Sequence, residues 1–108
     1  ASGRIERNEK LAGSVCDAII TPQPGNITFP IMTHHCGPGI AVTEDEALHA
    51  MVLAFLRLKV VVEPGGAVAL AAALFHGAEL KSDTIIAVAS GGNVDPEIMA
   101  HALSRFGH

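Results

Sequence analysis

The sequence has few positive charges and few aromatic side chains. Its 108 residues include 7 Lys and Arg against 11 Asp and Glu, for a formal charge of −4, and four Phe but neither Trp nor Tyr. A chain with so little positive charge has no basic surface to attract nucleic-acid phosphates or anionic lipid headgroups. We therefore expect neither nucleic acid nor a membrane among its partners.

Long hydrophobic runs are also absent. The longest strongly apolar stretches, residues 60–62 and 67–75, fall well short of the roughly 20 residues that a membrane-spanning helix needs. The first ten residues are polar and do not begin with Met, so they hold no signal-peptide core. We expect a soluble, cytoplasmic protein whose start is processed or truncated.

Several common functional motifs do not occur. Cys16 and Cys36 are the only cysteines and form no CxxC, so we expect two reduced thiols. The nucleotide-binding fingerprints GxGxxG and GxxxxGK are missing, as are the HExxH and GxSxG motifs of zinc proteases and serine hydrolases. His34 and His35 are neighbours whose side chains point apart, so we predict no metal site there.

What the sequence does contain is enough apolar surface to fold. Apolar residues make up 49% of the chain, and the mean hydropathy is +0.39. Burial of that surface offsets the entropy of ordering the chain. No repeat, low-complexity tract or linker divides the sequence, so residues 1–108 are expected to form a single, partial domain.

The clearest expected element is a helix that begins after Thr43. Thr43 and Glu46 fit a capping box, in which the Thr43 hydroxyl accepts from the Glu46 amide and the Glu46 carboxylate accepts from the Thr43 amide. Arg57 and Lys59 suit the last turn, where the helix dipole favours cations. Helical spacing predicts one apolar face made of Leu48, Met51, Val52, Phe55 and Leu58.

From residue 39 onward, short β-branched runs alternate with helical patterns, an order typical of α/β folds with parallel strands. A short extended segment over residues 39–42 precedes the helix just described, and a short helix with Pro30 in its first turn lies before that. The later elements are expected to be a strand over residues 60–62, a turn at 64–66, a helix over 67–75, a strand over 84–89 and a closing helix with Asp95 as N-cap and Pro96 in its first turn.

Both predicted strands and the helix between them are apolar on every side. Such elements need cover on both faces of the sheet, and a chain of this length cannot supply it alone. We therefore predict a three-layer parallel-sheet fragment of an α/β protein. It is either part of an intimate homo-oligomer or, as we favour, a piece of a larger α/β domain.

Two polar residues, Glu63 and Ser90, stand at the ends of the two predicted strands, and a glycine pair follows each. A right-handed crossover makes these strands parallel, so their carboxyl ends lie at one edge of the sheet, where α/β proteins bind ligands. The sequence thus predicts a small-molecule site at Glu63 and Ser90. A purely structural reading, in which the glycines turn the chain and Glu63 is solvated, stays open.

The remaining titratable residues give weaker signals. His49 is expected on the polar side of its helix and His76 near a helix end, positions where histidine is ordinary. The three lysines, Lys10, Lys59 and Lys81, are expected outside any buried pocket that would depress a lysine pKa. We therefore predict no catalytic histidine or lysine in this chain.

Two strings of residues resemble a known family. VVEPGGAVAL at residues 61–70 and SGGNVD at residues 90–95 resemble the C-terminal third of the serine/threonine dehydratase family of fold-type II pyridoxal-phosphate enzymes. This family includes threonine ammonia-lyase, serine racemase and hydroxyaspartate dehydratase. The upstream strings CDAI at 16–19, TP at 21–22, NITFP at 26–30 and VTEDE at 42–46 fit the same family in order, so the resemblance runs from about residue 14 to the end.

The resemblance implies roles for five residues. In the family, the serine of SGGN donates to the pyridine nitrogen of pyridoxal phosphate, a role that falls to Ser90 with Gly91 beside it. The glutamate before the proline lies close to the cofactor ring, which implies Glu63. Asp17 and Ala18 match the segment that approaches the cofactor from the opposite edge, although many relatives have Gly in place of Ala18.

The implied reaction suits a hydroxyl at Ser90. A carboxylate would hold the pyridine nitrogen protonated and make the ring a deep electron sink, whereas a neutral hydroxyl makes a shallower one. A shallow sink is adequate for loss of the α-proton and departure of a β-hydroxyl. The resemblance therefore implies conversion of a β-hydroxy amino acid (threonine, serine or 3-hydroxyaspartate) to a 2-oxo acid and ammonia.

The same resemblance implies that other parts of the site lie elsewhere. The family's Schiff-base lysine, substrate loop, phosphate loop and divalent-metal ligands would all precede residue 1, and no regulatory domain would follow the closing helix. We expect these 108 residues to be inactive alone. Two alternatives are a non-catalytic α/β module or truncated paralogue acting through partner binding, and an anion-binding domain, which the lack of basic residues disfavours.

Overall fold

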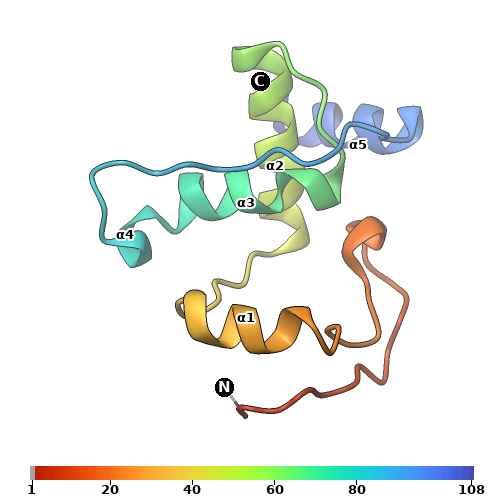
Figure 1. Ribbon diagram of the computed structural model, residues 1–108. Coiled ribbons are helices and arrows are strands. Elements are labelled where there is room, and N and C mark those ends of the chain that lie inside the picture. Colours follow the sequence, from red (N-terminus) through yellow and green to blue (C-terminus); the bar gives the residue numbers. More distant parts are fainter. Residues whose placement is uncertain (1) are drawn as a thin grey trace.

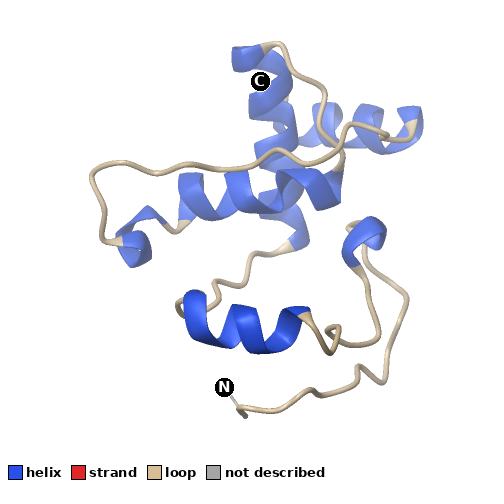
Figure 2. Cartoon of the chain, viewed as in Figure 1, coloured by secondary structure: helices blue, strands red, loops and turns tan. Residues whose placement is uncertain are grey.

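Helices are the only regular secondary structure in residues 2–108, the part of the chain that this computed structural model describes (Figures 1 and 2). The Cα radius of gyration is 14.9 Å, and the molecule measures 42 × 35 × 18 Å, so it is flattened. The elements in chain order are a 3-10 turn η1 (Asp17–Ile19), α1 (Thr28–His35), α2 (Glu44–Leu53), a π-helical turn η2 (Ala54–Leu58), α3 (Pro64–Phe75), α4 (Gly77–Leu80) and α5 (Pro96–Phe106).

The helix predicted after Thr43 is confirmed together with its capping box. The Glu46 amide donates to Thr43 Oγ1 at 3.2 Å, and the Thr43 amide donates to Glu46 Oε2 at 2.7 Å. Helix α2 continues directly into η2 and ends at Lys59, which has a left-handed backbone with φ of 60°. The predicted end near Lys59 is therefore also correct.

The core lies where α2 crosses α3 and α5. Three of the five predicted face residues, Leu48, Met51 and Val52, are buried there, but Phe55 and Leu58 are 37% and 63% exposed. Both lie in η2, where the wider i→i+5 turn rotates residues off the face that α2 presents. The other buried apolar residues of this core are Ala50, Ala54, Val62, Ala67, Ala71 and Ala102.

Helix α5 is fastened to α2 by a paired ion contact. The Arg105 guanidinium donates to both oxygens of Asp45, at 2.6 and 2.7 Å, and these hydrogen bonds lower the pKa of the Asp45 carboxyl. His49 of α2 lies beside this contact, with its ring stacked at 5.2 Å from Phe75 and 4.9 Å from Phe106. His49, expected on the polar side of its helix, is instead half-buried, because aromatic rings from α3 and α5 stack against it.

Helix α3 begins at Pro64, three residues earlier than predicted. Proline suits the first helical position because a backbone N–H there would have no acceptor within the helix. Gly65 and Gly66 continue the helix instead of breaking it. One side of α3 packs on α2 through Ala67 and Ala71, both fully buried.

The two predicted strands are extended segments that form no ladder within residues 2–108 (Figure 2). One backbone hydrogen bond, from the Glu63 amide to the Gly91 carbonyl at 2.9 Å, joins the residues just beyond their carboxyl ends. A strand requires a neighbour along its whole length, and these two segments meet only at their carboxyl ends. The helices of the predicted α/β fold are confirmed, whereas the parallel sheet stays a prediction.

Much apolar surface lies open along these segments and α3. Ile86 and Val88 are 88% and 67% exposed, and Leu74 at the end of α3 is 48% exposed. The total accessible surface is 7746 Å², against about 5,700 Å² for a compact protein of this mass. These exposed segments belong to the two predicted strands and the helix between them, which the sequence predicted to need cover that this chain does not supply.

The remaining elements agree only partly with expectation. Helix α1 has Pro30 in its first turn, and α5 begins at Pro96, as predicted, but the Asp95 side chain makes no capping hydrogen bond. The short elements η1 and α4 were not predicted. In the described part of the chain, every helix is too short or too polar to cross a bilayer.

Candidate functional site

Segments from three parts of the chain meet at the start of α3. Glu63 is the residue immediately before the helix. Its backbone N–H donates a hydrogen bond to the Gly91 carbonyl, and this bond brings the turn at residues 90–93 against it. From the other side, η1 approaches the first turn of α3, so that a Cβ placed on Gly65 would lie 3.5 Å from Ala18 Cβ and 3.3 Å from Ile19 Cγ2. The predicted site residues thus come from segments that α3 holds together.

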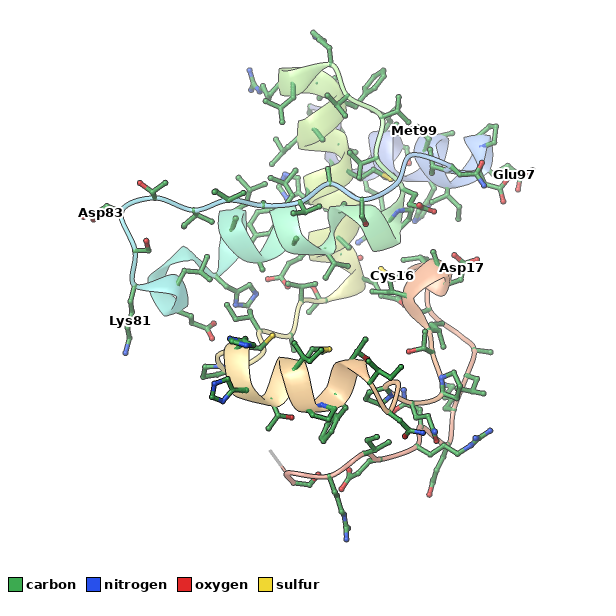
Figure 3. The ribbon with its side chains drawn as sticks, viewed as in Figure 1. Cys16, Asp17, Lys81, Asp83, Glu97 and Met99 are labelled. Carbon is green, nitrogen blue, oxygen red and sulfur yellow. The ribbon has the colours of Figure 1, made fainter. Side chains whose placement is uncertain are left out.

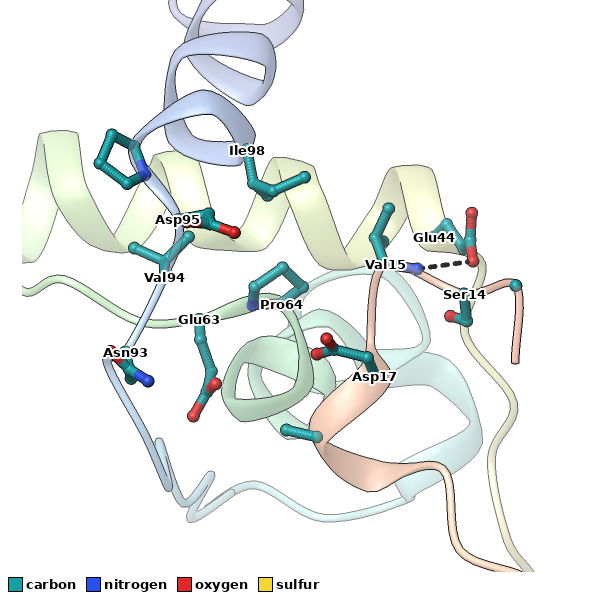
Figure 4. Close-up of a pocket in the computed structure, with 13 residues that line it drawn as sticks. Ser14, Val15, Asp17, Glu44, Glu63, Pro64, Asn93, Val94, Asp95 and Ile98 are labelled. Carbon is teal, nitrogen blue, oxygen red and sulfur yellow. Dashed lines mark hydrogen bonds between the residues drawn. The ribbon is translucent and has the colours of Figure 1, made fainter. Parts of the chain in front are cut away.

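A hollow of about 880 Å³ opens between these segments. Figure 4 shows Glu63 and Asn93 on one side of it and Asp17 on the other. The residues that line it are Gly13, Ser14, Val15, Asp17, Ala18, Glu44, Glu63, Pro64, Asn93, Val94, Asp95, Pro96 and Ile98. Three of the five predicted site residues, Asp17, Ala18 and Glu63, therefore share one cavity.

The other two predicted residues lie next to this cavity without lining it. Ser90 is exposed and Gly91 is half-buried. Gly91 contacts Glu63 closely, since a Cβ on Gly91 would collide with Glu63 Oε1. The predicted pairing of Glu63 with the Ser90 turn is thus present in the backbone contact, while the Ser90 side chain itself stays in solvent.

The lining of the hollow is acidic. Four carboxyl groups, those of Asp17, Glu44, Glu63 and Asp95, belong to it, and the lining includes no Lys or Arg. Glu44 is held in place because the Val15 amide donates to its Oε1 at 3.1 Å (Figure 4). Negatively charged, hydrogen-bond-accepting side chains suit neutral or cationic groups and disfavour a phosphate, which proteins bind with basic side chains and amide clusters.

Sequence reasoning missed four polar residues of the hollow: Ser14, Glu44, Asn93 and Asp95, the last of which was expected only as a helix N-cap. Asn93 stands three residues after Ser90 in the same turn, so its position in the SGGN string was an available signal. No sequence signal distinguishes Ser14 or Glu44, because each reaches the hollow through the path of the 13–16 segment beside α2.

Cys16 is buried beside Asp17 of the hollow, and Cys36 is exposed at the end of α1; both are free thiols. Burial raises the pKa of the Cys16 thiol, and a hydrogen bond with Ser14 opposes that rise only in part. A buried thiol with a raised pKa is a poor nucleophile. Cys16 therefore has a packing role beside the site.

None of the three lysines lines the hollow. Lys59 donates to the Leu56 carbonyl at 2.8 Å, at the end of η2. Lys81 follows α4, at the opposite end of α3 from Cys16 and Asp17 (Figure 3). That no lysine of this chain reacts in the site stays a prediction.

His76 forms a separate polar cluster at the far end of α3. Its Nε2 lies 3.0 Å from Glu46 Oε1 of α2, and its Nδ1 lies 2.9 Å from Glu79 Oε1 of α4. The hydrogen bond to Glu79, and then that to Glu46, raise the pKa of His76 above its ordinary 6.5. The Glu46 carboxyl has a lowered pKa, first because the Thr43 amide donates to it.

These shifts predict a pH-dependent stability. Protonated His76 has a raised pKa in the folded protein, so its contribution is complete below pH 6.5 and is lost as the pH rises through the raised pKa. The urea midpoint is therefore expected to fall as the pH rises above 6.5, and His76→Gln is expected to remove that part of the fall. His34→Gln, an exposed control, should retain it; equal profiles for wild type and His76→Gln would contradict the assignment.

The chain matches, over residues 2–91, the protein family described as pyridoxal-phosphate dependent enzyme, and it belongs to that family. It is 38% identical over 97 residues to a serine racemase of Dictyostelium discoideum, covering 87% of this chain and 30% of that protein. It is 32% identical over 107 residues to an L-threonine ammonia-lyase of Thermotoga maritima, covering 97% of this chain and 26% of that protein.

A solved structure agrees with these sequence relatives. The crystal structure of a T.th. threonine deaminase has a TM-score of 0.81 at 42% identity and covers 87% of this chain and 31% of that one. The chain thus spans less than a third of the length of these three relatives. The resemblance inferred from the sequence strings is confirmed, and pyridoxal phosphate is the cofactor of the family.

Proposed function

We propose that this chain is part of a pyridoxal-phosphate dependent ammonia-lyase that converts a β-hydroxy amino acid to a 2-oxo acid and ammonia. The observation that carries the proposal is the convergence of Asp17, Ala18 and Glu63 on one hollow, with the Ser90–Gly91 turn bonded to the backbone of Glu63. The names of the relatives, serine racemase and L-threonine ammonia-lyase, favour serine and threonine as the substrate class.

The hollow fits one end of the cofactor. Its volume of about 880 Å³ lies within the range of about 300–1,000 Å³ that is common for small-molecule pockets. The lining holds no basic side chain for the phosphate group, so in this proposal only the ring end of the cofactor enters the hollow and residues outside the lining hold the phosphate. Glycine at position 91 leaves room for the Glu63 carboxylate beside the turn that carries Ser90.

Each residue then has a defined task. The Ser90 hydroxyl donates a hydrogen bond to the pyridine nitrogen and leaves it unprotonated, because a hydroxyl is a far weaker acid than a pyridinium ion. Glu63 would hold the ring from one side of the hollow, and Asp17 and Ala18 from the other. When bound, the cofactor supplies an electron sink for charge that develops at the substrate's α-carbon.

The open apolar surface supports two further parts of the proposal. Exposed Ile86, Val88 and Leu74 need cover, and contiguous apolar surface of this kind marks an interface. We propose that other parts of a larger catalytic unit, itself a homo-oligomer, cover them, and that residues 1–108 alone catalyse nothing. Dehydratase turnover by the purified 108-residue chain would contradict this second part.

The test uses the protein at the full length that its gene encodes. Addition of pyridoxal phosphate is expected to produce a visible absorbance band, and L-serine or L-threonine is expected to give a 2-oxo acid and ammonia in equal amounts. D-serine formed from L-serine without 2-oxo acid would instead indicate a racemase. A protein that stays colourless with added cofactor would refute the proposal and favour a non-catalytic module that acts by binding a partner.

A further inference from the structure

Gly66, in the first turn of α3, lies against the backbone of Gly91. A Cβ added to Gly66 would lie 2.7 Å from the Gly91 carbonyl oxygen and 2.8 Å from the Gly91 nitrogen. Such separations are shorter than carbon can adopt beside backbone atoms without displacing them. Gly66 is buried, so a side chain at this position has no route into solvent.

The same Gly91 residue contacts Glu63. Its carbonyl accepts the Glu63 amide hydrogen at 2.9 Å, and the Glu63 carboxylate occupies the space where a Cβ on Gly91 would lie. Gly91 is therefore held between the first turn of α3 and the residue that precedes it. The position of Ser90, which is bonded directly to Gly91, follows from these contacts.

A glycine inside a helix is unfavourable relative to alanine because it loses more backbone entropy on folding. Local helix stability therefore favours alanine at position 66, and the close approach of the Gly91 backbone opposes it, with Val62 Cγ1 a further tight neighbour at 3.1 Å. The neighbouring Gly65 differs, since a Cβ there would meet side-chain atoms of Ile19 and Ala18 at 3.3 and 3.5 Å, distances that small side-chain shifts can absorb.

We propose that Gly66 is a positioning residue for the cofactor site: by lacking a side chain, it sets the separation between Glu63 and the Ser90–Gly91 turn. The inference rests on the proposed function, in which Glu63 and Ser90 bind the pyridoxal-phosphate ring. A methyl group at position 66 pushes the turn away from α3, moves the Ser90 hydroxyl off the ring nitrogen and leaves the chemistry of every ring-binding side chain unchanged.

The test titrates pyridoxal phosphate into the cofactor-free, full-length protein and its Gly66→Ala variant. The variant is expected to bind the cofactor about tenfold more weakly or worse, as overpacking of this kind costs, and its visible band is expected to shift because the ring nitrogen has lost its donor. Gly77→Ala is the matched control, since it adds a methyl group to helix α4 with nothing within 4 Å.

A second variant covers the case in which Gly66→Ala fails to fold. The nearest neighbours of a Cβ on Gly91 all belong to the movable Glu63 side chain, so Gly91→Ala is expected to fold while the carboxylate is displaced. Gly91→Ala is expected to weaken cofactor binding less in a Glu63→Ala background than in the wild type, because both changes remove the same carboxylate from the site.

The outcomes separate the two proposals. Wild-type protein that does not bind pyridoxal phosphate overturns the proposed function and, with it, this inference. Wild-type protein that binds the cofactor, with a Gly66→Ala variant that matches Gly77→Ala in affinity and absorbance, overturns the positioning role alone. If Gly66→Ala does not fold, additive losses for Gly91→Ala and Glu63→Ala overturn it instead.

Discussion

Met51→Ala is expected to lower the free energy of unfolding by about 2–5 kcal/mol. Met51 is fully buried on the α2 face that packs against α3 and α5, and it is the largest of the fully buried side chains. Truncation removes its transfer free energy and leaves a cavity that three crossing helices close only in part. The measurement is urea unfolding of the protein, followed by circular dichroism in the helical region.

Met32→Ala is the control for this prediction because it makes the same substitution on α1 at a side chain that is 50% exposed. Its effect is expected to stay within about 0.5 kcal/mol, as is usual for surface positions. If the two variants unfold at the same urea concentration, Met51 does not lie in the core and the packing of α2 described above is incorrect.

Ser90→Ala is expected to lower kcat/KM for 2-oxo acid formation by about 10- to 100-fold, the usual range for loss of one strong hydrogen bond. In the proposed function, the Ser90 hydroxyl is the donor to the pyridine nitrogen, and alanine leaves that nitrogen without a partner. Ser90→Thr keeps the hydroxyl and is expected to retain most of the activity.

Ser104→Ala provides the control for Ser90→Ala. The Ser104 hydroxyl donates to the His101 carbonyl within α5 at 2.7 Å, and Ser104 is not part of the lining of the hollow. Its kcat/KM is expected to equal that of the wild type. Unchanged activity and absorbance in Ser90→Ala would remove Ser90 from the cofactor site.

Helix positions were predictable wherever a local signal fixed an end. The capping box of Thr43 and Glu46 placed the start of α2, and Pro96 placed the start of α5. The start of α3 was predicted too late because Gly65 and Gly66 are strong turn residues in isolation. Their helical state depends on close packing against η1 and the turn at Gly91, contacts that the local sequence does not encode.

The strands could not be derived in the same way, because strand formation depends on partners that are distant in sequence. Residues 84–89 have the β-branched, apolar composition of a buried strand, yet they remain extended and exposed within residues 2–108. Similarly, His49 was expected on the polar side of its helix, but its ring stacks on Phe75 and Phe106, which approach from two other helices. Tertiary contacts decided both outcomes.

The candidate site was predictable to the level of its segments. The sequence placed Glu63 and Ser90 at neighbouring strand ends, and the structure has a backbone hydrogen bond from the Glu63 amide to the Gly91 carbonyl at that place. The contributions of Glu44 and Ser14 to the hollow could not be predicted, because they depend on how the chain before α1 folds back beside α2. The sequence strings were enough to identify the family, whereas the close approach of Gly66 to Gly91 is visible only in the structure.

The most direct test of this account is a crystal structure of the protein, at the full length its gene encodes, with pyridoxal phosphate bound. The account predicts that the pyridine ring lies in the hollow between Glu63 and Asp17, with Ser90 Oγ within hydrogen-bonding distance of the ring nitrogen. A cofactor ring that contacts neither Glu63 nor the Ser90–Gly91 turn would contradict it.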